Sequence, residues 1–227
     1  MEQWDNMAAN GTMAKARFRH WRNKIDGSLD RREAKYATMF NEAFRSNTGE
    51  APAFYPTAGA ANYSLLYTLM RCLTELPVAK TLELGMGQST ILLDALSADA
   101  VSVDHEKPWV ERMAGRVKHP CVHAPLVERQ VHGYAVPCYD FVASQFDMIL
   151  VDGPQGARRR SRWCSLDILD KCLGDEFIVI FDDAARKGEQ DTVREFLTSR
   201  NAELHLIQGS DAQIIIYTPK FAVVKYF

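Results

Sequence analysis

Two closely spaced glycines follow the first strongly apolar run of the sequence. The run Thr81–Leu84 predicts a buried strand, and Gly85 and Gly87 separate it from a helix that we expect to begin near Ser89. Glycine lets the backbone turn sharply and lets a ligand approach the main chain closely. The spacing therefore predicts a ligand-binding turn between strand and helix, although an ordinary tight turn would use the same residues.

An acidic residue lies at the end of the next predicted strand, about 20 residues beyond the glycines. Asp104 follows the apolar run Ala100–Val103, and Glu106 is a second candidate if that strand runs further. A carboxylate in this position can bind both hydroxyl groups of an adenosine ribose. Together, the glycines and the acid predict a cofactor that contains adenosine.

The residues around the turn distinguish between two such cofactors. A dinucleotide-binding turn has Gly or Ala where this chain has Thr90, and it places a pyrophosphate at the helix N-terminus. Glu83 would be poorly placed beside a pyrophosphate but well placed near the ammonium group of a methionine moiety. The charges therefore favour S-adenosylmethionine. An NAD-type oxidoreductase is the alternative, and the lack of a Tyr-x-x-x-Lys pair also counts against it.

Three further carboxylates follow two apolar runs typical of central strands. Asp152 follows Met148–Val151, and Asp182 and Asp183 follow Phe177–Phe181. At the carboxyl edge of a parallel sheet they would repel one another, which raises pKa values unless a cation compensates. One solution is a divalent cation such as Mg²⁺, bound by all three aspartates. The other is pairing with arginine, for which the sequence offers Arg158, Arg159, Arg160, Arg162 and Arg186.

Four of these arginines lie in one loop, residues 153–162, directly after Asp152. Arginine binds phosphate and carboxylate through paired hydrogen bonds. We therefore expect Arg158, Arg159 and Arg186 to bind an anionic substrate such as a sugar phosphate, a uronic acid or a polyanionic glycan. A solvated surface run of arginines is the alternative interpretation.

Several of these motifs resemble those of one enzyme class. Glu83-Leu84-Gly85-x-Gly87, followed by Asp104, resembles the first two motifs of class I S-adenosylmethionine-dependent methyltransferases, and residues 146–154 resemble their fourth motif. The resemblance covers roughly residues 60–218. Within the class, three segments are similar to those of methyltransferases associated with polysaccharide biosynthesis: Gly85–Thr90, Val151–Pro154 and Asp182–Gln190.

The resemblance implies a function and a set of site residues. We expect O-methylation of a small or carbohydrate-like, anionic acceptor. Its hydroxyl proton must be removed, either by Asp152 or Asp182 as general base or with the help of a metal that lowers its pKa. In the similar catechol-type O-methyltransferases, matching positions bind a metal, but the second residue of the adjacent pair is commonly Asn, where this chain has Asp183. A non-catalytic module of a carbohydrate-assembly pathway stays open as an alternative. The implied cofactor-binding residues are Glu83, Gly85, Gly87, Gln88, Ser89, Thr90 and Asp104.

The order of apolar runs predicts the fold that positions these residues. Runs typical of strands alternate with helical patterns, which favours parallel βαβ units. We expect a doubly wound α/β domain over residues 59–227, with a mostly parallel seven-stranded sheet and an antiparallel last strand. Residues 1–58 are expected to form a helical extension and a connector. The expected strands are 81–84, 100–103, 122–127, 148–151, 177–181, 203–208 and 212–218, and the expected helices after the first strand are 91–96, 109–117, 165–172 and 189–199.

Composition narrows the expected partners and location. The formal net charge of −2 and the pI near 6.3 predict neither nucleic-acid nor membrane binding. Five scattered cysteines suggest reduced thiols, and the N-terminus lacks the apolar stretch of a signal peptide, so we expect a cytoplasmic protein. The expected partners are a small-molecule or saccharide acceptor and a second copy of the chain in a homodimer.

Overall fold

The computed structural model describes residues 63–142, 144–198, 200–207 and 213–226. The helices expected within residues 1–58 lie outside this part, so the proposed division at residue 59 stays a prediction. No helix in the described ranges is both long and apolar enough to cross a membrane.

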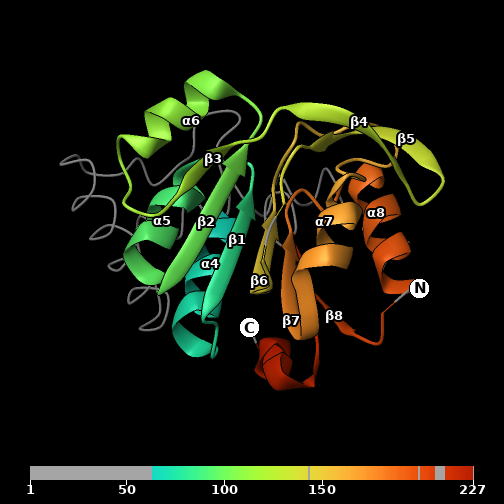
Figure 1. Cartoon of the computed structure of the whole chain (residues 1–227). Helices are drawn as coiled ribbons and strands as arrows, with labels where there is room; N and C mark the ends of the chain where they lie inside the picture. Colours follow the sequence, from blue (N-terminus) through green and yellow to red (C-terminus); the bar gives the residue numbers. More distant parts are fainter. Residues whose placement is uncertain (1–62, 143, 199, 208–212, 227) are drawn as a thin grey trace.

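A seven-stranded sheet forms the centre of the domain (Figure 1). The strand order is β3-β2-β1-β6-β7-β9-β8. All neighbouring strands from β3 to β7 are parallel, whereas β9 runs antiparallel to both β7 and β8. The predicted fold class is therefore confirmed. The strands are β1 Lys80–Leu84, β2 Asp99–Asp104, β3 Cys121–His123, β6 Phe146–Val151, β7 Leu173–Phe181, β8 Glu203–Ile207 and β9 Gln213–Tyr217.

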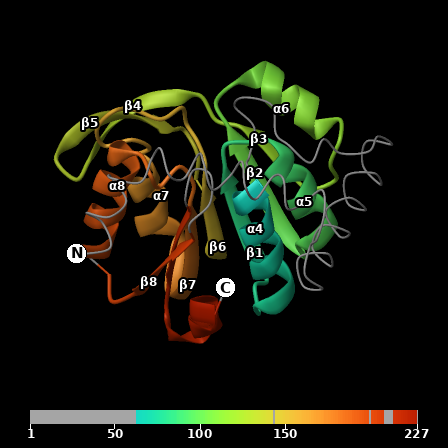
Figure 2. The ribbon, with the colours of Figure 1, turned by 180° about the vertical axis from the view of Figure 1, so that it is seen from behind.

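Helices cover both faces of the sheet, as Figures 1 and 2 show from opposite sides. One face packs against α4, α5 and α6, and the other packs against α7 and α8. Side chains of a strand alternate between the faces, so Leu150 joins the first core and Val151 the second. Because both faces are buried, the central strands β6 and β7 contain unbroken apolar runs, Met148–Val151 and Phe177–Phe181. The helices are α4 Tyr63–Glu75, α5 Gln88–Leu96, α6 Lys107–Ala114, α7 Ser165–Cys172 and α8 Lys187–Thr198.

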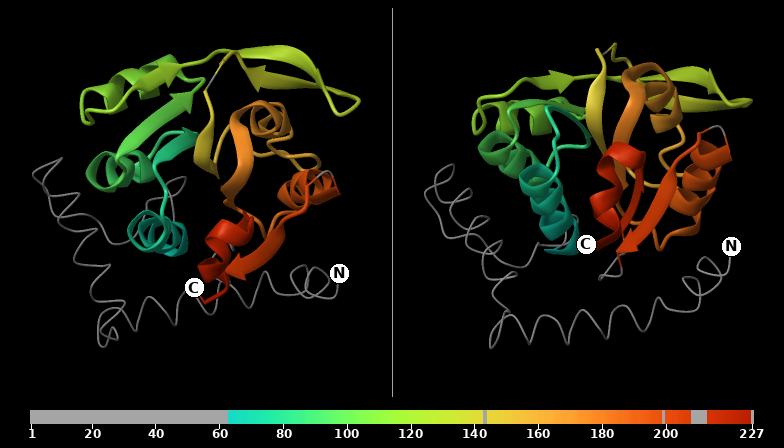
Figure 3. Two further views of the ribbon diagram at one scale, coloured as in Figure 1. Left: turned by 60° about the horizontal axis from the view of Figure 1, so that its bottom comes forward. Right: turned by 90° about the horizontal axis from the view of Figure 1, so that it is seen from below.

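A short 3-10 helix, Pro219–Tyr226, ends the described chain. Figure 3 shows it beside β8, at the end of the molecule away from the hairpin β4–β5. Its Phe221 and Val224 are buried in the same core as α4. The C-terminal segment therefore completes the first face of the sheet.

One prediction about the strands was wrong. The segment Val122–Val127 does not form a single strand, because β3 ends at His123 and a separate strand, β4 Leu126–Val131, begins three residues later. Pro125 lies between them and lacks the N–H group that a continuous ladder needs. β4 pairs with β5 Tyr134–Tyr139 in a two-stranded antiparallel hairpin outside the main sheet. In Figure 1 this hairpin arches over one end of α7 and α8.

The ends of β1 and β6 approach each other at two glycines. Gly85 has a φ of +95°, and a Cβ atom placed on it would lie 2.7 Å from the backbone nitrogen of Gly153. Gly87, two residues later, has an extended φ of −173°, and nothing lies closer to its Cβ position than the Ser89 hydroxyl at 4.0 Å. Of Gly85 and Gly87, only Gly85 is therefore required by the fold.

Separate replacement of Gly85 and of Gly87 tests the close approach of Gly85 to Gly153. Gly85→Ala is expected to lower the free energy of unfolding by roughly 1–3 kcal/mol from its backbone conformation alone, because alanine rarely adopts positive φ. Gly87→Ala is the matched control and should stay within about 0.5 kcal/mol of the natural chain. Urea unfolding followed by circular dichroism measures both. Equal stability of the two variants would contradict the account of Gly85.

Candidate functional site

A cavity of about 490 Å³ lies at the carboxyl edge of the sheet. Its size suits a small ligand, and ligands of open α/β sheets bind at this edge. The loops after β1, β2, β6 and β7 contribute to its wall, together with the end of β5. The lining residues are Gly85, Met86, Asp104, His105, Glu106, Trp109, Tyr139, Asp152, Gly153, Pro154, Gln155, Gly156, Arg162, Asp182, Asp183 and Arg186.

Asp104 fixes the glycine turn from the end of β2. Its Oδ2 accepts a hydrogen bond from the Met86 N–H at 2.9 Å, and its Oδ1 accepts one from the Glu106 N–H, also at 2.9 Å. The residue is only 7% exposed but lines the cavity. A carboxylate oxygen accepts more than one hydrogen bond, so Asp104 can hold the turn and still receive a ribose hydroxyl.

Glu83 lies beneath the turn and does not line the cavity. Its Oε2 accepts a hydrogen bond from the Thr90 hydroxyl at 2.7 Å, and that hydroxyl in turn accepts one from the Gly87 N–H at 2.9 Å. Burial raises the pKa of Glu83 to about 7, and nearby hydroxyl groups oppose this only in part. Its Oε1 and the Gln88 Oε1 are buried without a hydrogen bond of good geometry among the described residues. Buried polar atoms of this kind are expected where a ligand completes the bonding.

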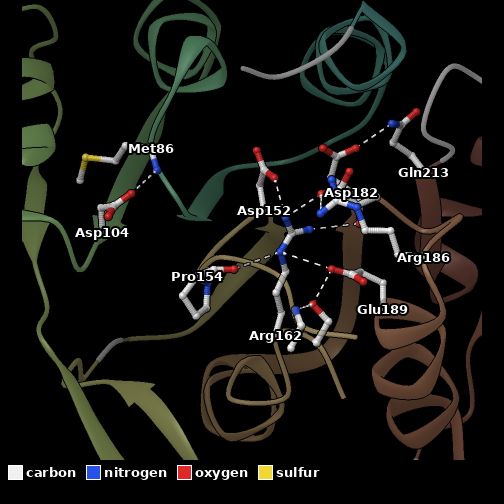
Figure 4. Close-up of polar contacts among 12 residues, drawn as sticks. Met86, Asp104, Asp152, Pro154, Arg162, Asp182, Arg186, Glu189 and Gln213 are labelled. Carbon is white, nitrogen blue, oxygen red and sulfur yellow. Dashed lines mark hydrogen bonds and ion pairs between the residues drawn. The ribbon is translucent and has the colours of Figure 1, made fainter. Parts of the chain in front are cut away.

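One guanidinium group, that of Arg162, contacts all three aspartates, and Figure 4 shows it beside Asp152 and Asp182. Its Nη2 donates to Asp152 Oδ1 at 3.1 Å and to Asp183 Oδ2 at 2.8 Å. Its Nη1 donates to the Asp182 carbonyl at 3.2 Å, and its Nε donates to the Pro154 carbonyl at 3.3 Å. Only 4% of this side chain is exposed. The expected pairing with arginine is therefore present for Asp152 and Asp183, whereas Asp182 meets Arg162 only through its backbone carbonyl.

The remaining contacts differ between the two adjacent aspartates. Asp182 Oδ1 accepts a hydrogen bond from Gln213 Nε2 at 2.7 Å, whereas Asp183 forms a second ion pair, with Arg186 Nη1 at 2.7 Å. Burial, with the charge of Asp183, raises the pKa of Asp182 to about 6. Burial, with the charge of Asp182, also raises the pKa of Asp152 well above its ordinary value. Two carboxyl groups with raised pKa values therefore face the cavity.

A divalent cation would compete with Arg162 for these aspartates. One oxygen of each carboxylate lies within 4.8 Å of the others, a spacing that a metal ion can bridge. The guanidinium already bridges Asp152 and Asp183, and Asp183 is shared with a second arginine. A metal held by all three would have to displace Arg162, so the observed arrangement does not fit the predicted metal set. Metal binding stays a prediction.

Six predicted site residues meet at this cavity, and others do not. Of the predicted substrate-binding arginines, Arg186 lines it, Arg158 is exposed outside it, and Arg159 is paired with Asp191 at 2.6 Å. Sequence reasoning missed Trp109 and Tyr139, which both line the cavity. The predicted residues in the wall are Gly85, Asp104, Asp152, Asp182, Asp183 and Arg186, and those that do not line it are Glu83, Gly87, Gln88, Ser89 and Thr90.

Comparison with known proteins identifies the fold. No protein-family profile and no curated protein matches the sequence. A methyltransferase from Pyrococcus furiosus is 12% identical, with a TM-score of 0.50, over 81% of this chain and 97% of its own. An SAH-bound Podospora anserina methyltransferase is 13% identical, with a TM-score of 0.49 over 84% and 97%. A methyltransferase from Geobacter sulfurreducens is 17% identical, with a TM-score of 0.47 over 87% and 94%. The likeness to the Pyrococcus furiosus protein shows that the chain has a Rossmann-like methyltransferase fold.

The buried Glu83 predicts a stability that falls as pH rises. Its pKa is about 7 in the folded chain, above the ordinary glutamate value of 4.5, so the folded state holds the proton more tightly. This contribution is complete below the unfolded pKa and is lost as pH rises through about 7. From about pH 5 to pH 8, the natural chain should lose roughly 3 kcal/mol relative to Glu83→Gln, which stays neutral. Urea unfolding without cofactor measures this, with the exposed Glu128→Gln as control. A difference that stays constant with pH would contradict it.

The guanidinium of Arg162 predicts a large loss of stability on its removal. Arg162→Met leaves Asp152 and Asp183 without their shared cation, which should lower the free energy of unfolding by about 3–5 kcal/mol. Arg158→Met removes an exposed charge from the same loop and should change it by no more than about 0.5 kcal/mol. Urea unfolding compares the two variants. Similar stabilities would show that Arg162 does not hold the cluster.

Proposed function

We propose that the protein transfers a methyl group from S-adenosylmethionine to a hydroxyl group of a small or carbohydrate-like, anionic acceptor. One observation carries the proposal: Asp152 and Asp182, whose pKa values are both raised, share a cavity with the glycine turn and Asp104. The first two are suited to proton transfer, and the last two are suited to binding adenosine. The methyltransferase fold supports the combination.

The glycine turn and its surroundings would hold the cofactor. Asp104 would receive the ribose hydroxyls, and Gly85 lets a ligand approach the turn without a side chain in the way. Trp109 Nε1 donates a hydrogen bond to the Met86 carbonyl, which fixes its indole in the cavity wall. It therefore offers an apolar surface to an adenine. The predicted contact of Glu83 with the cofactor's ammonium group would require the turn to open, because Glu83 is fully buried beneath the turn and does not line the cavity.

When bound, S-adenosylmethionine supplies an electrophilic methyl group on a sulfonium. The chain must align the acceptor oxygen with that group, because displacement is in line, and it must take up the hydroxyl proton. Asp182 has a pKa of about 6, so it is largely ionised near neutral pH and still basic enough to accept a proton. Asp152 is the second candidate base. One of its carboxylate oxygens lies within 4.8 Å of one of Asp182, and 23% of its side chain is exposed.

The charge of Arg162 would allow Asp152 and Asp182 to act as bases although both are largely buried. Its positive charge lowers the pKa values of Asp152 and Asp182 against the stronger effect of burial. Without such a cation, the pKa values of both carboxyl groups would rise further, and both would be weaker candidates for taking up a proton near neutral pH. We therefore assign the charge compensation to a guanidinium and route no step through a metal.

The charge at the mouth of the cavity supports an anionic acceptor. Arg186 lines the cavity with 55% of its side chain exposed, and its ion pair with Asp183 leaves other donors of the guanidinium available. Arginine donors in this geometry bind carboxylate or phosphate in pairs. A uronic acid or a sugar phosphate carries both that anion and the hydroxyl group that would receive the methyl group.

Asp182→Asn should abolish turnover without affecting cofactor binding. The amide cannot accept the proton, so kcat should fall by about 10²–10⁴-fold, whereas Gln213 can still donate to the Asn oxygen. Release of S-adenosylhomocysteine with glucuronic acid, galacturonic acid and sugar phosphates as acceptors measures the rate. Calorimetric titration with S-adenosylhomocysteine measures cofactor affinity.

The matched control is Asp99→Asn, at the opposite end of β2, where the side chain pairs only weakly with Lys80 at 3.8 Å. It should keep the rate of the natural chain. Natural turnover in Asp182→Asn would overturn the assignment of this residue as the base. Tight cofactor binding by the natural chain without turnover on any acceptor would instead favour the non-catalytic alternative.

A further inference from the structure

A second cavity of about 270 Å³ lies beside the first. The strand β5 forms one wall, and the arginine loop between β6 and α7 forms the other. Pro154, Gln155 and Arg162 line both cavities, so the two spaces adjoin across these residues. The remaining lining residues of the second cavity are Tyr134, Ala135, Val136, Pro137, Ala157, Arg159, Arg160, Trp163 and Cys164.

An aromatic pair gives the second cavity a fixed wall. The ring of Tyr134 packs edge to face on Trp163, with centroids 5.5 Å apart and an interplanar angle of 86°. Trp163 is 5% exposed, and its Nε1 donates a hydrogen bond to the Val131 carbonyl at 3.0 Å. Both contacts hold the hairpin β4–β5 against Trp163, which follows the loop 153–162. Tyr134 itself is 43% exposed and lines the second cavity, so part of its ring is accessible from there.

The guanidinium of Arg160 lies over this exposed ring, with its Cζ atom 3.9 Å from the ring centroid of Tyr134. Among the described residues, no carboxylate lies within ion-pair distance of Arg160, whereas the neighbouring Arg159 is paired with Asp191. Arg160 is therefore an uncompensated cation held in place by an aromatic ring. Such a group is suited to bind an anion that enters the cavity.

The backbone of the loop directs its arginines to different cavities. Arg160 and Arg162 both have positive φ values, 46° and 53°, which is a strained conformation for residues with side chains. Ser161, between them, is held on α8 from three sides: its N–H donates to the Gly188 carbonyl, its hydroxyl to Glu189, and its carbonyl accepts from the Thr192 hydroxyl. The strain is thus maintained by hydrogen bonds, with Arg162 at the aspartates and Arg160 at the second cavity.

We propose that the second cavity binds the neighbouring unit of an acidic oligosaccharide whose reacting unit occupies the first cavity. Arg160 would pair with the carboxylate of that neighbouring unit, and the ring of Tyr134 and Pro137 would face its C–H groups. The inference rests on the proposed function, because it assumes that the first cavity holds the unit to be methylated. It predicts that the protein prefers a chain of uronic acids to a single one.

The test compares galacturonic acid with its trimer in calorimetric titrations, with S-adenosylhomocysteine already bound. The trimer should bind the natural chain more tightly than the monomer and more tightly than the neutral maltotriose. In Arg160→Met, the affinity for the trimer should fall by about tenfold or more, because a charge-assisted hydrogen bond is lost. The affinity for the monomer should not change.

Two further variants make the result specific. Tyr134→Ala should weaken binding of the trimer alone, and the exposed Arg116→Met, which lines neither cavity, should bind both sugars like the natural chain. Unchanged affinity of each variant for S-adenosylhomocysteine shows that it is folded. If S-adenosylhomocysteine binds but the trimer binds no better than the monomer, or if Arg160→Met binds the trimer normally, the second cavity is not an acceptor site. Failure of S-adenosylhomocysteine itself to bind would overturn the proposed function, and this inference with it.

Discussion

A buried guanidinium in the middle of three aspartates holds the carboxyl edge of this sheet together. Arg162 contacts the end of β6 through Asp152 and the end of β7 through Asp183, and it also binds the carbonyl of Pro154 in its own loop. Buried charges are tolerated only when they are paired and hydrogen-bonded. The carboxylates require the arginine, and the arginine requires a loop that returns to the sheet edge. The course of residues 153–162 follows from this mutual requirement.

The two cavities both depend on that loop. Its first residues line the larger cavity beside the glycine turn, where Gly85 and Gly153 come so close that neither has room for a side chain. Its last residues carry Arg160 to the ring of Tyr134 on the hairpin. One electrostatic interaction therefore places the glycine turn, two carboxyl groups with raised pKa values and the Arg160–Tyr134 pair next to one another. These are the parts that transfer of a methyl group to an anionic sugar would require.

Sequence patterns predicted the sheet and the meeting of the aspartates, because adjacent parallel strands end at the same edge and Val151 pairs in register with Phe181. They did not predict the hairpin β4–β5, since Pro125 divides a run that is apolar enough to be one strand. Tyr139 was missed for the same reason. The sequence also left open which arginine meets the acids. That choice depends on the left-handed backbone at Arg162 and on the bonds of the loop to α8, which no periodicity reveals.

The central claim is that the larger cavity binds S-adenosylmethionine, and calorimetric titration of S-adenosylhomocysteine into the metal-free protein tests it most directly. The account predicts one binding site per chain with a dissociation constant in the micromolar range, and no competition from NADH. It further predicts that the binding persists in the presence of a chelator, because Arg162, and not a metal ion, compensates the charge of the aspartates. An absence of binding, or displacement of S-adenosylhomocysteine by NADH, would contradict the account.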